Sequence, residues 1–167
     1  MASKFPDQTR RHVLMLAGSS LVLTLSGCRS IDFLSPHDGS SRAETDAALP
    51  MVNRIRAEQG LVDLERNRAA EKAAIAQAER MARAGEMKHL IGFNDSFLER
   101  MKGHDVPLPA AENIAAGQDS VGRAVQSWID SRRHLDNMLG NFRGLGVAVA
   151  WDSASANRPY WAMILSA

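Results

Sequence analysis

The sequence has very little cysteine and no strong excess of either charge. Cys28 is the only cysteine among the 167 residues, so no disulfide can form within the chain. Hydrophobic residues make up 45% of the chain and charged residues 23%, which is typical of a globular protein and excludes a disordered one. A chain of this length predicts a single domain that packing alone can stabilise.

Positive and negative side chains almost cancel, because 20 Lys and Arg stand against 19 Asp and Glu. Nucleic-acid binding needs a concentrated basic face. Arg132-Arg133 is only a pair, which we interpret as a solvated helix end. Nucleic acid is therefore not a predicted partner.

The chain also lacks an apolar run long enough to span a bilayer comfortably. The run Val13–Leu25 is too short for that, but it follows a basic start at Lys4, Arg10 and Arg11 and has the length of a signal-peptide core. It ends in Leu25-Ser26-Gly27-Cys28, which resembles a bacterial lipobox. We therefore predict a signal peptide over 1–27 and lipidation of Cys28. Thr9-Arg10-Arg11 also resembles a twin-arginine signal, so two export routes remain open.

The predicted lipid on Cys28 would anchor the protein to a membrane on the periplasmic side of the cell envelope. Arg29 is not the aspartate that retains some lipoproteins in the inner membrane, which favours the outer membrane. Residues 28–46 contain Ser, Asp and Pro with little apolar periodicity, which predicts a flexible tether. The folded domain is expected over 47–167.

Apolar periodicity predicts several helices in this domain. The clearest pattern is Val121, Ala124, Val125, Trp128 and Ile129, which places one apolar face on a helix. An alanine-rich segment before Gly85 predicts a helix whose small residues let another element approach closely. A short helix is expected to carry Phe97 and Leu98 inward. The predicted helices cover about 47–59, 67–84, 96–101, 121–129 and 133–139.

The C-terminal part predicts strands. In residues 145–151 and 160–166, side chains of different type alternate along the chain, which is typical of strands. Residues 152–159 are predicted to be the loop between them, so the two strands should form an antiparallel hairpin. Neither alternation is strictly apolar and polar, which predicts that both faces of the hairpin are partly covered. Residues 111–115 are a further candidate strand. Helices combined with a small antiparallel sheet predict an α+β or layered α/β/α domain.

Several short motifs follow one another in an order that resembles a known family. They are Asn53-x-x-Arg56, Gly60-Leu61-x-x-Leu64, Met87-Lys88-His89, Glu112-Asn113-Ile114-Ala115, Trp128-x-x-Ser131-x-x-His134, Gly144-x-Gly146-Val147 and Tyr160-Trp161. Together they resemble a bacterial member of the CAP superfamily, also called SCP-like, which includes cysteine-rich secretory proteins, antigen 5 and pathogenesis-related proteins. The resemblance covers about 47–167 and implies a three-layer α-β-α sandwich with a small antiparallel sheet.

The resemblance also implies a cleft lined by two histidines and acidic groups. His89 and His134 match the two cleft histidines, and Glu112 matches the first cleft glutamate, with Asn113 beside it. The place of the second glutamate is taken by Ser131, which puts strong metal binding in doubt. Two imidazoles and one carboxylate are nevertheless a possible ligand set for a divalent metal such as zinc.

Two alternatives concern the same residues. Ser131 and His134 are three positions apart and share a helix face, so they could form a nucleophile–base pair. We prefer the interpretation that Ser131 ends or caps a helix, since it lacks a nucleophile-elbow context. Asn113 and Asn137 can bond backbone groups in turns at the edge of a cleft.

These residues are compatible with two functions. The first is a lipid-anchored module whose cleft binds a lipid, glycan, peptide or partner protein at the envelope. The second is a metal-assisted or acid–base hydrolase of envelope material, because neutral histidine suits general-base work near pH 7. Ser131 at the position of the second carboxylate favours binding over catalysis.

Overall fold

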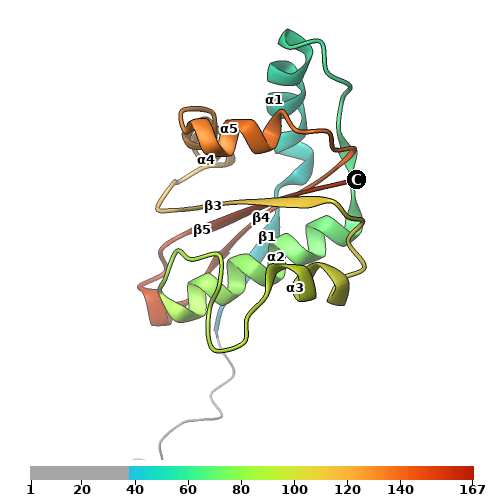
Figure 1. Cartoon of the computed structure of the whole chain (residues 1–167). Helices are drawn as coiled ribbons and strands as arrows, with labels where there is room; N and C mark the ends of the chain where they lie inside the picture. Colours follow the sequence, from blue (N-terminus) through green and yellow to red (C-terminus); the bar gives the residue numbers. More distant parts are fainter. Residues whose placement is uncertain (1–37) are drawn as a thin grey trace, which may run out of the picture. The chain divides into compact units, whose positions relative to one another are not determined.

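The computed structural model describes residues 38–167, which form an antiparallel sheet with helices on both faces (Figure 1). The predicted signal peptide and Cys28 lie outside these residues, so the lipid anchor stays a prediction. Within the described part of the chain, no helix is both long and apolar enough to cross a membrane.

Four strands of the sheet run in the order β1-β4-β5-β3, and each neighbouring pair is antiparallel. Their bounds are β1 Ser40–Ala43, β4 Gly144–Trp151, β5 Tyr160–Ser166 and β3 Ala110–Ala116. A two-residue strand, β2 (Glu65–Arg66), pairs in parallel with the start of β4. The predicted hairpin and the candidate strand at 111–115 are confirmed, and β3 lies at one edge of the sheet.

All five predicted helices are present, with ends within a few residues of their predicted positions. They are α1 Thr45–Glu58, α2 Arg68–Ala84, α3 Phe97–Gly103, α4 Val121–Ile129 and α5 Arg132–Met138. Helices α1, α4 and α5 cover one face of the sheet, while α2 and α3 cover the other (Figure 1). The α+β fold class and its three α-β-α layers are thus confirmed.

Each face of the sheet has its own hydrophobic core. Trp128 of α4 and Trp161 of β5 are buried in the first core, with Val147 of β4 between the layers. The second core is built mainly from alanines of α2 packed on Ala148 and Ile164. The small side chains of α2 therefore allow the close approach that its sequence predicted.

Two expectations need correction. Residues 40–46 belong to the folded domain and not to the tether, because Ser40–Ala43 pair with Trp151–Ala148 of β4 and α1 begins at Thr45. The four-residue strand is mostly exposed, so its sequence shows no apolar alternation, and its structure depends on pairing with β4. Leu98 is exposed, whereas Met101, about one turn further along α3, is fully buried.

Candidate functional site

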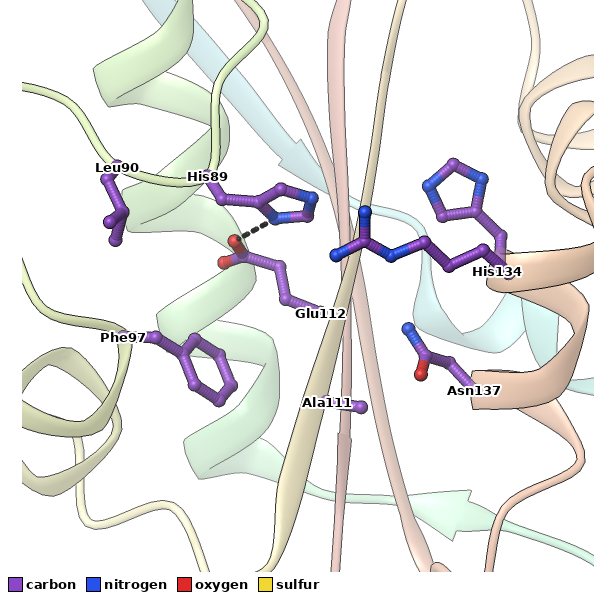
Figure 2. Close-up of a pocket in the computed structure, with 8 residues that line it drawn as sticks. His89, Leu90, Phe97, Ala111, Glu112, His134 and Asn137 are labelled. Carbon is purple, nitrogen blue, oxygen red and sulfur yellow. Dashed lines mark hydrogen bonds and ion pairs between the residues drawn. The ribbon is translucent and has the colours of Figure 1, made fainter.

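An open cleft of about 380 Å³ lies beside the edge strand β3. One wall is the segment that connects α2 to α3, and the other wall is α5 (Figure 2). The lining residues are His89, Leu90, Phe97, Ala111, Glu112, Arg133, His134 and Asn137. The cleft therefore brings together His89, Glu112 and His134, the three residues singled out by the family resemblance.

His89 and Glu112 are in direct contact. The His89 Nδ1 atom lies 2.9 Å from Oε1 of Glu112, and the Glu112 side chain is buried while the imidazole is partly exposed. Because a carboxylate only accepts hydrogen bonds, Nδ1 carries the proton in this pair. In the neutral ring, Nε2 is then left as an acceptor, and Figure 2 shows the ring extending toward the middle of the cleft.

Arg100 of α3 holds the Glu112 carboxylate by hydrogen bonds to both of its oxygens. Its Nη1 donates to Oε2 of Glu112 at 2.9 Å, and its Nη2 donates to Oε1 at 3.3 Å and to the His89 carbonyl at 2.9 Å. The guanidinium thus orients both the carboxylate and the backbone that carries His89. Arg100 could not be selected from the sequence, because it lies in a short helix outside every motif of the resemblance.

A second ion pair holds the segment that carries His89. Arg80 of α2 pairs with Asp95 and donates to the Ile91 carbonyl at 2.8 Å, while Gln77 donates to the Lys88 carbonyl at 2.9 Å. Burial alone would raise the pKa of Asp95, but hydrogen bonds from Arg80 and the Ile91 amide, with the charges of Arg80 and Arg100, lower it below its ordinary value. This wall of the cleft is therefore well anchored to α2.

Asn113 does not line the cleft, contrary to expectation. It is fully buried, and its Nδ2 donates to the His134 carbonyl at 3.0 Å, while Asn137 Nδ2 donates to its Oδ1 at 2.8 Å. Asn113 therefore attaches α5 to β3 and positions the wall that carries His134. The alternative interpretation of both asparagines as backbone-bonding residues describes Asn113 correctly, but Asn137 bonds a side chain and also lines the cleft.

Ser131 occupies the N-cap position of α5, although its side chain makes no capping hydrogen bond. Its carbonyl accepts from the Leu135 amide at 2.8 Å. It is absent from the cleft lining, and no hydrogen bond joins it to His134 among the described residues. The geometry therefore gives no support to a Ser131–His134 nucleophile–base pair.

His134 is held in an environment that disfavours its charged form. Burial desolvates the imidazolium, and repulsion from Arg133, and from His89 whenever that ring is protonated, adds to this, so the pKa of His134 lies below its ordinary value. Its Nδ1 atom is buried without a hydrogen-bond partner in the described structure. His134 therefore offers a neutral ring to the cleft near pH 7.

We expect the lowered pKa of His134 to appear in the pH dependence of folding. An unfolded histidine titrates near about 6.5, so below this pH the unfolded chain binds a proton that the folded chain accepts less readily. Stability should therefore fall as pH drops through about 6.5 and level off below the folded pKa. Urea unfolding between pH 5 and 7.5 measures this. His134→Gln should lose this component, whereas His104→Gln, outside the cleft, should keep it. Equal profiles for both variants would contradict the assignment.

The residues of the cleft do not fit a divalent metal in this arrangement. Within residues 38–167, no three His, Cys, Asp or Glu side chains gather into a group able to hold a metal ion. The physical reason lies in Glu112, whose two oxygens are both engaged by the positively charged Arg100. The expected zinc triad of His89, His134 and Glu112 is thus not formed.

Zinc titration by calorimetry checks this directly. We expect no stoichiometric heat at micromolar zinc for the wild-type protein, because a cation at Glu112 would have to displace Arg100. His89→Ala should give the same flat titration. Stoichiometric zinc binding that disappears in His89→Ala would show that the cleft rearranges around a metal.

The three-layer fold and the cleft over β3 define an α-β-α domain of the CAP/SCP type. The model of the cysteine-rich secretory protein (CAP) family matches residues 49–165, and the chain belongs to this family. It is 31% identical over 99 residues to the uncharacterized protein YkwD of Bacillus subtilis. That match covers 58% of this chain and 38% of YkwD, so the chain spans well under half of that relative's length.

Solved structures show the same fold. An outer surface protein of Borrelia burgdorferi superposes with a TM-score of 0.63 at 17% identity, covering 76% of this chain and 96% of that chain. An extracellular protein of Bacillus anthracis that contains an SCP domain has a TM-score of 0.63 at 24% identity, and the match covers 74% of this chain and 40% of that chain. A cysteine-rich secretory protein of Staphylococcus aureus has a TM-score of 0.52 at 20% identity, and the match covers 73% of this chain and 38% of that chain. At these identities, the likeness concerns the fold alone.

Proposed function

We propose that this protein is an extracytoplasmic recognition module, attached to the outer membrane through a lipid on Cys28, whose cleft binds a ligand at the cell envelope. The signal-peptide pattern before Cys28 supports the location. The descriptions of two structural neighbours, an outer surface protein and an extracellular protein, agree with it.

The observation that carries the proposal is a cleft with fixed polar groups, whose lining among residues 38–167 includes no serine, threonine or cysteine. Nε2 of His89 is oriented as an acceptor by Glu112 and Arg100. On the opposite wall, Arg133 is exposed and forms no ion pair with any residue between 38 and 167. Because Arg100 already balances Glu112, the cleft carries a surplus positive charge, which favours a ligand with an anionic group.

Apolar side chains complete the lining. Leu90 and Phe97 belong to the same wall as His89, and Leu90 is exposed. Pockets that bind organic ligands typically combine apolar walls with a few oriented polar groups. The cleft therefore suits a ligand with both an anionic and an apolar part, a description that a lipid, a glycan conjugate, a peptide or a partner protein can each meet.

Histidine NMR signals provide the test. The ring signals of His89 and His134 in the full-length protein would be followed during titration with anionic phospholipid vesicles, peptidoglycan fragments and peptide mixtures. At least one class should shift both cleft signals and leave His104 unchanged. His89→Ala should weaken the interaction about tenfold or more, the cost of one lost hydrogen bond to an oriented group, while His104→Ala should not. Unchanged cleft signals with every class would refute the proposal.

The His89–Glu112 pair supports one alternative, a hydrolase that uses His89 as a general base. A carboxylate that accepts from Nδ1 leaves Nε2 of the neutral ring able to take a proton from water. Release of soluble products from peptidoglycan or envelope lipids, abolished in His89→Gln, would establish this activity. Ligand binding without any product would leave recognition as the function.

A further inference from the structure

The edge strand β3 has main-chain groups beside the cleft that are unpaired among residues 38–167. In the sheet order β1-β4-β5-β3, β3 pairs with β5 alone among residues 38–167, so its other side is a free edge within this part of the chain. A free edge can accept another strand, and proteins usually cover or interrupt such edges.

Bonds at the two ends of β3 settle its direction. The Pro109 carbonyl accepts from the Ala167 amide at 3.0 Å, and the Gly117 amide donates to the Pro159 carbonyl at 2.8 Å. Both bonds run toward the β5 side. In an antiparallel strand, N–H and C=O of one residue point the same way and alternate along the chain. The odd-numbered residues therefore bond β5, and the even-numbered residues 110, 112, 114 and 116 point outward.

Side chains already cover the C-terminal half of this free edge. Trp128 Nε1 donates to the Ile114 carbonyl at 3.1 Å, and Arg158 donates to the Ala116 carbonyl at 3.2 Å. Both bonds agree with the outward direction of even-numbered residues. They also block the C-terminal part of β3 from pairing with strands of other molecules.

The remaining open part lies in the cleft. Among residues 38–167, neither the Glu112 amide nor its carbonyl has a hydrogen-bond partner, although the Glu112 side chain is fully engaged. The neighbouring Ala110 and Ala111 are small, and Ala111 lines the cleft. In Figure 2, β3 runs between the wall that carries His89 and the wall that carries His134. A chain lying in the cleft would therefore meet the free main chain of Glu112.

We propose that the cleft binds an extended peptide, which adds to β3 as a further strand and places a carboxylate at Arg133. This inference rests on the proposed recognition function and names its ligand class. A peptide strand presents donors and acceptors at the same two-residue spacing as Ala110 and Glu112. Alternate side chains would then face the apolar Leu90 and Phe97 on one wall and Arg133 on the other.

Amide hydrogen exchange in the full-length protein gives the first test. Without peptide, the Glu112 amide should exchange at least about tenfold faster than the Asn113 amide, which bonds β5. The probe is a ten-residue peptide library in which each member carries one Asp or Glu. At ten times the dissociation constant of a selected member, exchange at Glu112 should slow about tenfold, while exchange at Asn113 stays constant.

Backbone and charge variants give the second test. N-methylation of alternate peptide bonds in the ligand should reduce affinity with a period of two, because only alternate amides face β3. Ala110→Pro removes one outward amide without touching the β5 ladder and should weaken binding about tenfold. Arg133→Glu should weaken binding of acidic peptides similarly. The adjacent Arg132→Glu is the matched control, since Arg132 is outside the cleft and pairs with Asp136.

The outcomes separate the two proposals. Slowed exchange at Glu112 with period-two N-methyl sensitivity supports strand addition. Peptides that shift the cleft histidines without protecting Glu112 overturn strand addition and leave recognition intact, as does binding of glycans or lipids alone. Protection of Glu112 before any peptide is added means that residues 1–37 or a second copy occupies the edge, which also overturns it. If no ligand class shifts the histidines, both proposals fail.

Discussion

Replacing Gly146 with alanine should destabilise the protein by about 3 kcal/mol or more, the upper range for overpacking a dense core. A Cβ atom at this position would lie 2.2 Å from the Ala70 carbonyl carbon and from the Glu71 amide nitrogen. Both atoms belong to the backbone of α2, so no side-chain rotation relieves the clash. Helix α2 would have to move away from β4, and the alanine-rich core between them would open.

Urea unfolding followed by circular dichroism measures this effect. Gly103→Ala is the matched control, because a Cβ atom there meets nothing within 4 Å and the residue ends α3. The control should be neutral or slightly stabilising, since alanine favours helix by about 1 kcal/mol over glycine in a helix interior. Equal stability of the two variants would show that α2 does not pack on β4 as closely as described.

The second large effect is expected for Arg56→Met. Arg56 is buried without a carboxylate partner within residues 38–167, and backbone carbonyls surround its guanidinium. Nε donates to Val62 at 2.9 Å, and Nη1 donates to Met138 at 2.8 Å and Gly140 at 2.9 Å. Burial and the nearby Arg143 lower the pKa of Arg56, and Asp63 partly offsets them. The residue thus ties α1 to the C-terminal end of α5.

Methionine keeps the aliphatic part of this side chain and removes every donor. Leaving several buried carbonyls without a partner costs about 1–3 kcal/mol for each group, so a total loss of about 3 kcal/mol or more is expected. Arg54→Met on the exposed side of the same helix should change stability by less than about 0.5 kcal/mol. Thermal unfolding compares the two variants. The NMR signals of His134 should broaden or shift only in Arg56→Met, because Arg56 supports the end of the helix that carries His134.

Arg56 also explains one motif of the sequence. In Asn53-x-x-Arg56, the Asn53 side chain donates to the Leu64 carbonyl at 3.0 Å and accepts from the Leu64 amide at 2.9 Å. The motif Gly60-Leu61-x-x-Leu64 is the segment that these two side chains hold. Residues of different family motifs are therefore in contact in the fold, and only some of the motif residues line the cleft.

Most elements of the fold were predictable because their signals are local. The apolar face of α4, the alternation in β4 and β5, and the alanines of α2 follow from periodicity alone. The strand β1 was not predictable, because its exposed side chains carry no pattern and only its pairing with β4 makes it a strand. Leu98 was misplaced because a short helix gives too few positions to define its buried face.

The candidate site shows the same division. Histidines, a carboxylate and a serine stand out by residue type, and the resemblance selected His89, Glu112 and His134 correctly as neighbours of one cleft. It also included Asn113, whose side chain faces α5 and is fully buried. Arg133 was interpreted as a solvated helix end, and only its position beside the cleft makes it a candidate for ligand contact.

The sequence by itself determined the helices, the hairpin and the family, since these depend on patterns within short stretches of chain. Only the tertiary structure decided the chemistry of the cleft. Arg100 engages both oxygens of Glu112 and so removes the carboxylate from a metal triad. The order of strands leaves the Glu112 main chain without a partner strand among the described residues 38–167. Both facts arise from residues that are distant in the sequence and become neighbours when α3 and α5 pack on opposite faces of one edge strand.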